Sequence, residues 1–150
     1  MKRMQMKVIC LALVLALCGA GLALAADETK TLGESYILIA KGKYDQAQEL
    51  LDEILAKDPG NPLALNNLAA VMVGMKKFDK ALTYLNQALP KAQGYMVAVN
   101  LVCTVGNICV ALNPVAGTSS NQDLAPLIKM NIEMVKGYMT AGPLPGKGLR

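Results

Sequence analysis

Cysteine is the residue type in this 150-residue chain that most directly suggests redox or metal chemistry, and the chain has four cysteines and no histidine. The absence of histidine excludes histidine-containing zinc sites, Ser-His-Asp and Cys-His catalysis, and c-type haem attached through Cys-x-x-Cys-His. No Cys-x-x-Cys pair is present to lower the pKa of a thiol. Without a nucleophile–base pair, a cluster of metal ligands or a phosphate-binding loop, we expect no catalytic residue, no metal site and no cofactor, and we do not expect an enzyme.

Two of the cysteines, Cys103 and Cys109, lie six residues apart in an apolar stretch. In a straight helix this spacing gives a rise of about 9 Å and places the two residues on different faces. That distance exceeds the Cα separation of about 7 Å that a disulfide can span. A disulfide would therefore require the helix to break at Gly106 and Asn107. Two interpretations remain open: a Cys103–Cys109 disulfide across such a break, and two small buried thiols.

The first 25 residues have the composition of a secretory signal segment rather than of a folded domain. Its parts are the basic residues Lys2, Arg3 and Lys7, the apolar run Val8 to Cys18, and the small residues Ala23 and Ala25 before a cleavage point. Cleavage would leave Ala26 first and place the mature chain in the periplasm or outside the cell. The alternative is a retained membrane anchor, because residues 8–26 carry no charge and nearly reach the length of a spanning helix. Gly19 and Gly21 argue against that alternative.

The predicted signal segment changes the charge balance, because it holds three of the 15 basic residues and none of the 11 acidic residues. The mature chain then carries 12 basic and 11 acidic residues. Nucleic-acid binding depends on clustered lysine and arginine, so we do not expect a nucleic-acid partner. The remaining length of the chain suits one domain with a hydrophobic core.

The chain repeats itself with a period of 34 residues. The segment Gly42 to Ala47 recurs as Lys76 to Ala81, and the same register pairs Tyr44 with Phe78, Asp45 with Asp79, Leu51 with Leu85 and Leu55 with Leu89. In both copies apolar residues recur at steps of three and four, which predicts amphipathic helices over residues 44–57 and 78–89. A single helix pair buries too little surface to be stable, so we expect such pairs to stack.

This pattern resembles the tetratricopeptide repeat. The resemblance is carried by the period, by the aromatic-Asp-x-Ala start of the second helix, and by the turn Asp58 to Asn61. In the clearer copy, Pro62 to Leu89, the pair Leu68-Ala69 matches the family's leucine and small residue. The resemblance covers Glu28 to Leu89. It implies an all-α fold, a short solenoid of antiparallel helix pairs with about two regular repeats, a degenerate third repeat and a capping helix.

The third unit departs from the pattern. Asn100 to Val102 aligns with Asn67 to Ala69, which predicts a first helix over Tyr95 to Leu112. This helix would be apolar nearly all round and therefore buried, the alternative being a membrane-spanning segment. We expect a polar loop over Val115 to Gln122 and a last helix with Asp123 as its cap. The predicted organisation is a signal segment (1–25), a helical repeat domain (26–140) and a flexible tail (141–150).

The resemblance to the family also implies where a partner binds, because the first helices of such repeats line a concave groove that grips a peptide or helix of another protein. The corresponding residues here are Tyr36, Ile39, Asn66, Ala70, Val73, Asn100 and Cys103. We therefore predict that this groove binds a periplasmic or envelope protein. The alternative for the groove is that the last helix folds into it. The alternatives for the function are a self-associating structural subunit, with the chain as a homo-oligomer, and a membrane-tethered assembly factor of an envelope complex.

Overall fold

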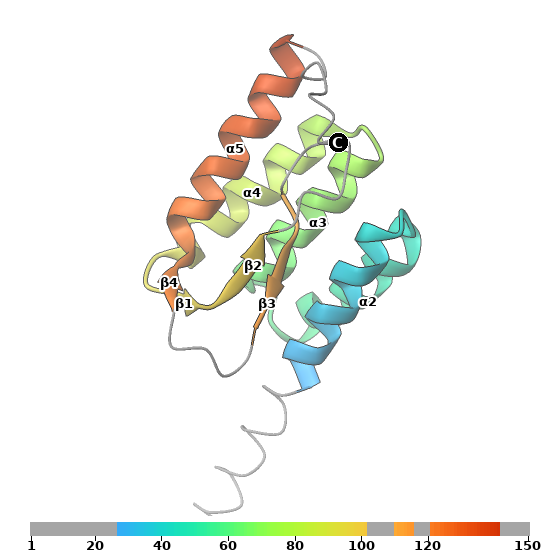
Figure 1. Ribbon diagram of the computed structural model, residues 1–150, viewed down its shortest axis with the longest axis vertical. Coiled ribbons are helices and arrows are strands. Elements are labelled where there is room, and N and C mark those ends of the chain that lie inside the picture. Colours follow the sequence, from blue (N-terminus) through green and yellow to red (C-terminus); the bar gives the residue numbers. More distant parts are fainter. Residues whose placement is uncertain (1–26, 102–109, 116–120, 142–150) are drawn as a thin grey trace, which may run out of the picture. The chain divides into compact units, whose positions relative to one another are not determined.

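A computed structural model of the chain describes residues 27–101, 110–115 and 121–141 (Figure 1). The chain divides into two compact units, residues 1–30 and 31–150, and the following description concerns the second unit. Residues 27–40 are helical, and the other helices are α2 (Tyr44–Lys57), α3 (Pro62–Gly74), α4 (Phe78–Ala92) and α5 (Leu124–Ala141). The strands are β1 (Met96–Val97), β2 (Val99–Leu101), β3 (Leu112–Pro114) and β4 (Gln122–Asp123). The predicted signal segment and the predicted tail beyond Ala141 lie outside the described residues.

The repeat seen in the sequence is present in the packing of α2 and α4. The buried residues of α2 are Ala47, Leu51 and Ile54, and the residues 34 positions later, Ala81, Leu85 and Ala88, are buried in α4. Each helix carries an aspartate in its first turn and a lysine in its last turn, where the helix dipole favours these charges. The prediction of a short helical repeat is confirmed for the two regular helix pairs.

The helix between them, α3, forms the centre of the core. Asn61 caps its N-terminus, because the side-chain oxygen accepts hydrogen bonds from the backbone N–H groups of Leu63 (3.1 Å) and Ala64 (3.0 Å). Pro62 follows in the first turn, where its missing N–H costs nothing. Every residue of α3 from Pro62 to Val73 is buried, so its two amide side chains, Asn66 and Asn67, also lie in the interior.

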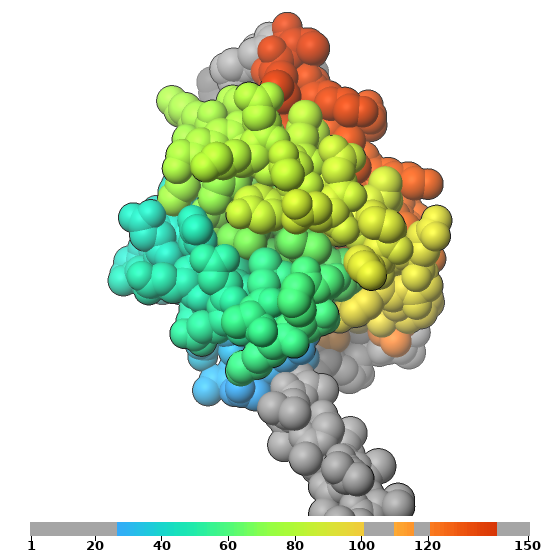
Figure 2. All heavy atoms as spheres, turned by 180° about the vertical axis from the view of Figure 1, so that it is seen from behind, coloured from blue at the N-terminus to red at the C-terminus, as the bar shows by residue number. Residues whose placement is uncertain are grey.

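The helix pairs approach each other closely at a glycine. A Cβ atom added to Gly74, at the end of α3, would overlap the ring of Tyr44 at the start of α2. After Gly74 the chain turns through Lys76, whose φ of 59° lies in the left-handed region, before α4 begins at Phe78. Figure 2 shows the face opposite that of Figure 1, where α2 and α4 lie next to each other.

The predicted helix over Tyr95 to Leu112 is wrong. α4 ends at Ala92, Gly94 has a φ of 72°, and the chain continues in short strands. β1 pairs with β4 and β2 pairs with β3, both antiparallel, with Leu101 opposite Leu112. The physical reason is composition: the segment is rich in β-branched valine, isoleucine and threonine, which favour strands. An apolar stretch of this length also has no periodicity that distinguishes a buried helix from buried strands.

The last helix agrees with the sequence. Asp123 caps α5, since its Oδ1 accepts a hydrogen bond from the backbone N–H of Ala125 (2.8 Å), and its Oδ2 accepts one from the N–H of Gly94 (3.1 Å). Pro126 lies in the first turn of α5. α5 packs on α4, and Ile128, Ile132 and Val135 are among its buried residues. Among the residues that the structure describes, no helix has both the length and the apolarity needed to cross a membrane.

Candidate functional site

The residues predicted to line a partner-binding groove lie mostly in the interior. The exposed fractions are 8% for Tyr36, 0% for Ile39, 0% for Asn66, 1% for Ala70 and 4% for Val73. Asn100 is exposed, but it lies on β2 rather than on a helix. Cys103 falls in the segment 102–109, outside the described residues, as does Cys109, so the disulfide and the buried-thiol interpretations both stay predictions. These residues therefore do not form an open surface in this structure.

We call the side of α3 that carries Asn66, Ala70 and Val73 the α3 face. Another segment of the chain, residues 110–112, packs against α3 at Asn66. Residues 110–112 lie over α3, with Leu112 beginning β3, and these residues are 1%, 1% and 0% exposed. On one side of them is α5, and on the other is the helix over residues 31–40, where Asn113 Oδ1 lies 3.6 Å from the position of a Cβ on Gly33. Figure 1 shows β2 and β3 between α5 and the first helix pair. Residues 110–112 thus lie against Asn66 and Asn67 of α3, and α5, which packs mainly on α4, reaches Asn66 through Asn131.

Asn67 holds the extended segment through the main chain of one residue. Its side-chain nitrogen donates a hydrogen bond to the carbonyl oxygen of Leu112 (2.9 Å), and its side-chain oxygen accepts one from the N–H of Leu112 (2.9 Å). A strand neighbour would make the same pair of bonds, so the amide of Asn67 replaces a strand at the free edge of β3. These bonds satisfy both backbone groups of a fully buried residue, which otherwise would lose free energy by desolvation.

Two further asparagines extend this contact. Asn66 donates from its side-chain nitrogen to the carbonyl oxygen of Val110 (2.7 Å), and Asn131 of α5 donates to the same oxygen (3.2 Å) and to Asn66 Oδ1 (2.8 Å). We call Asn66, Asn67 and Asn131 the asparagine cluster. All three side chains are completely buried. The Oδ1 atom of Asn131 is buried and meets no hydrogen-bond donor among the described residues.

The asparagine cluster offers hydrogen-bonding groups and no ionisable group. Its groups are neutral amides, which donate and accept hydrogen bonds without titrating. Every hydrogen bond that it makes to residues 110–112 is to a peptide C=O group, which every residue has, or to a peptide N–H group, which every residue except proline has. In the described part of the chain, no three histidine, cysteine, aspartate or glutamate residues gather to hold a metal ion. Burial raises the pKa of Tyr36 above its ordinary value of 10.0, so its hydroxyl stays protonated at neutral pH.

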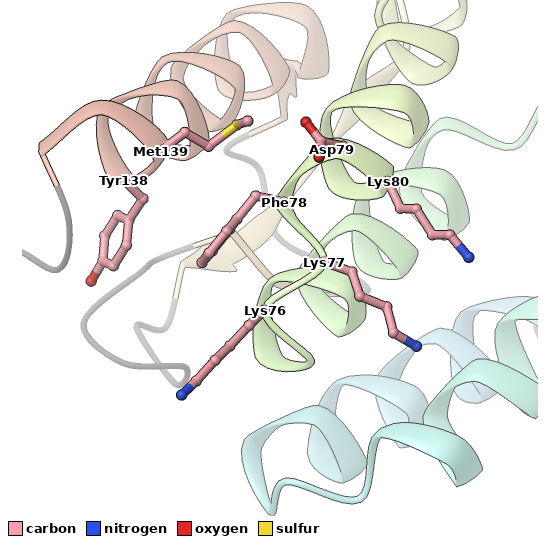
Figure 3. A pocket seen from close by; sticks show the side chains of 7 residues that line it. All are labelled: Lys76, Lys77, Phe78, Asp79, Lys80, Tyr138 and Met139. Carbon is pink, nitrogen blue, oxygen red and sulfur yellow. The ribbon is translucent and has the colours of Figure 1, made fainter.

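A second hollow lies between the start of α4 and the end of α5, with a volume of about 560 Å³ (Figure 3). Its lining residues are Lys76, Lys77, Phe78, Asp79, Lys80, Tyr138 and Met139. The rings of Phe78 and Tyr138 lie 6.2 Å apart, while the side chains of Lys77 and Lys80 extend away from them (Figure 3). This hollow has an aromatic wall and exposed lysines, but it lacks buried polar groups aimed at a ligand, so the asparagine cluster is the stronger candidate.

The buried positions of α2 recur 34 residues later in α4, and α3 packs on both of these helices. Residues 38–99 match the tetratricopeptide repeat family. Tetratricopeptide repeats generally mediate binding between proteins. The match ends at Val99, so β3 and α5 lie outside the tetratricopeptide segment. Searches of curated proteins and of solved structures find no match to the chain.

The sequence predicted Asn66 as a site residue, but it did not predict the hydrogen-bond partners of Asn66, which are Val110 and Asn131. Asn131 lies at helical spacing among Ile128, Ile132 and Val135, so a polar residue on the buried face of α5 was visible in the sequence. Buried amides need hydrogen-bond partners, and that requirement could have marked Asn131. The extended segment 110–112 carried no comparable signal, because the stretch around it was predicted as a helix.

Proposed function

We propose that this chain is an exported protein-interaction module that binds an extended segment of a periplasmic or envelope protein on the α3 face of its tetratricopeptide segment. The observation that carries the proposal is the double hydrogen bond of Asn67 to the main chain of Leu112. This contact supports the proposal because an amide side chain there holds the main chain of another segment, and a bound partner segment would be held by the same groups while its side chains set the selectivity. The family match supports a protein as the partner.

Ile37 is the exposed residue best placed to meet such a partner. It lies one helical turn after Gly33, which adjoins β3, and therefore on the same side of its helix. Its side chain is 49% exposed, although it is apolar, and Leu38 beside it is half-buried. An exposed isoleucine on the helix that adjoins β3 supplies apolar contact area that a bound segment would cover.

The test is photo-crosslinking in cells that make the full chain. Ile37 is replaced by a photoreactive phenylalanine analogue, and the matched control carries the same analogue at Asn86, an exposed residue of α4. We expect Ile37 to capture one protein that Asn86 does not capture, and we expect the purified pair to bind again in solution. Equal capture at both positions, or none at either, contradicts the proposed function.

Export is the second part of the proposal. It rests on the basic start, the apolar run and the small residues at 23 and 25. The mass of the protein recovered from the envelope fraction shows whether the signal segment has been cleaved. We expect the mass of a chain that begins at Ala26. A full-length chain in the membrane fraction would instead favour the membrane-tethered assembly factor.

A self-associating structural subunit is the remaining alternative. Light scattering at several protein concentrations separates it from the interaction module, because a monomer at all concentrations excludes self-association.

A further inference from the structure

Residues 110–112 occupy the place on α3 that a partner segment would take. They lead into β3, they carry the apolar and small side chains of Val110, Ala111 and Leu112, and the asparagine cluster bonds only their main chain. We propose that this segment is an internal ligand: it fills the α3 site in cis, and a partner segment binds by replacing it. The proposal rests on the proposed function, since it adds regulation to the same site.

The contacts define the chemistry of the segment that fits. Bonds from Asn67 to both backbone groups of Leu112 require a residue with a free N–H at that position, which excludes proline. The complete burial of all three side chains requires an apolar residue, a small residue and a second apolar residue in succession. The partner is therefore an extended segment with the pattern apolar-small-apolar, as in Val-Ala-Leu.

The internal ligand ends in β3, a short strand that pairs with one other strand in the described part of the chain. β3 has three residues, pairs with a β2 strand that also has three residues, and its other edge is bonded by side chains rather than by a strand. Two-stranded ribbons of this size are marginally stable alone. The residues matched by the tetratricopeptide family end before β3, so the two regular helix pairs do not include it.

The internal segment also leaves part of the cluster unused. Asn131 Oδ1 is buried at the cluster and accepts no hydrogen bond from the described residues. A replacing segment with the same backbone would form at this position the bonds that Val110 forms now.

The cost of releasing the internal ligand lowers the apparent affinity for any partner, because only the released fraction of molecules can bind. Variants that weaken the internal segment should therefore bind a free segment more tightly. Leu112→Ala removes most of the buried side chain and keeps the backbone bonds, while Leu112→Asp also places a charge in the core. Leu55→Ala on α2 is the matched control, since it loosens the fold away from the cluster.

The experiment measures binding of a synthetic peptide with the sequence of residues 110–115 to the full chain and its variants. We expect weak binding to the unchanged protein, about 10-fold tighter binding to Leu112→Ala and about 100-fold tighter binding to Leu112→Asp, as release becomes easier. Leu55→Ala should bind like the unchanged protein. A peptide N-methylated at the leucine should not bind, and Asn67→Leu combined with Leu112→Ala should abolish binding.

Helical circular dichroism shows whether each variant is folded. If a folded Leu112 variant binds the peptide no better than the unchanged protein, or binds the N-methylated peptide equally well, the internal ligand is refuted. If both Leu112 variants unfold, excess peptide is added to the unchanged protein, and hydrogen exchange of its own residues 110–112 is followed. Faster exchange with the peptide supports replacement, and an unchanged rate overturns it. Capture of a partner at Ile37 together with a negative peptide result leaves the proposed function standing without the internal ligand.

Discussion

Asn67 makes two hydrogen bonds to one buried residue, so its replacement has a defined consequence. Asn67→Leu keeps the approximate size of the side chain but leaves the N–H and C=O of Leu112 buried without partners. We expect a loss of about 3 kcal/mol in the free energy of unfolding, measured by urea denaturation. Asn86→Leu on the exposed surface of α4 is the control and should change it by less than about 0.5 kcal/mol. Similar values for the two variants would contradict the hydrogen-bonding role.

Replacing glycine by alanine should have opposite effects on the free energy of unfolding at two helical positions, Gly74 and Gly137. A Cβ on Gly74 meets the ring of Tyr44, whereas a Cβ on Gly137 in α5 meets no atom within 4 Å. Gly74→Ala should lower the free energy of unfolding by about 1–3 kcal/mol through overpacking. Gly137→Ala should raise it by about 0.5–1 kcal/mol, because alanine favours the helix. Thermal unfolding of both variants tests this, and a stabilised Gly74→Ala would show that the helix pairs are not in close contact there.

Tyr36 gives the chain a pH dependence in the alkaline range. Because burial raises its pKa in the folded state, the unfolded chain releases this proton first as the pH rises above 10.0. The contribution of Tyr36 to stability is therefore complete below that pH and is lost as the pH approaches the raised value. Urea unfolding between pH 9 and 11 should show a smaller decline for Tyr36→Phe than for the unchanged protein. Parallel declines would mean that Tyr36 titrates alike in both states.

At the level of the elements, periodicity decided what the sequence could predict. Helices α2 and α4 were predictable because Leu51 and Leu85 belong to matching apolar stripes with polar residues on the other side. The start of α5 was predictable because Asp123 and Pro126 are local signals. The strands after Gly94 were not, because their pairing depends on residues 11 to 27 positions away in the chain. The stretch after Gly94 is apolar on all sides, so it lacks the alternation of polar and apolar residues that distinguishes a strand from a helix.

Asp123 joins two elements, because one carboxylate oxygen caps α5 and the other holds the turn at Gly94. Asp123→Ala should therefore cost about 2 kcal/mol in the free energy of unfolding, at the upper end for loss of a cap. Asp79→Ala is the matched control, since Asp79 lies in the first turn of α4 but α4 has no side-chain cap bond. We expect that change to cost only about 0.5 kcal/mol through the helix dipole. Equal costs would show that the two bonds of Asp123 add nothing.

At the level of the whole molecule, α3 belongs to the tetratricopeptide segment, and residues 110–112 and Asn131 from the rest of the chain pack against it. Asn66, Ala70 and Val73 lie at helical spacing on α3, which the sequence alone predicts. The sequence could not show that residues 110–112 and Asn131 meet them, because a local pattern carries no information on contacts between segments about 45 and 65 residues apart. The contacts that the asparagine cluster makes to residues 110–112 and to α5 therefore come from the last third of the chain.

Hydrogen exchange at the backbone N–H of Leu112, followed residue by residue with NMR, tests the occupied α3 face most directly. The structure predicts that Asn67 Oδ1 accepts this proton in a completely buried site. We expect exchange at least about 100-fold slower than for an unprotected amide, and much faster exchange in Asn67→Ala. Exchange at the unprotected rate in the unchanged protein would contradict the account, because residues 110–112 would then not be held on α3.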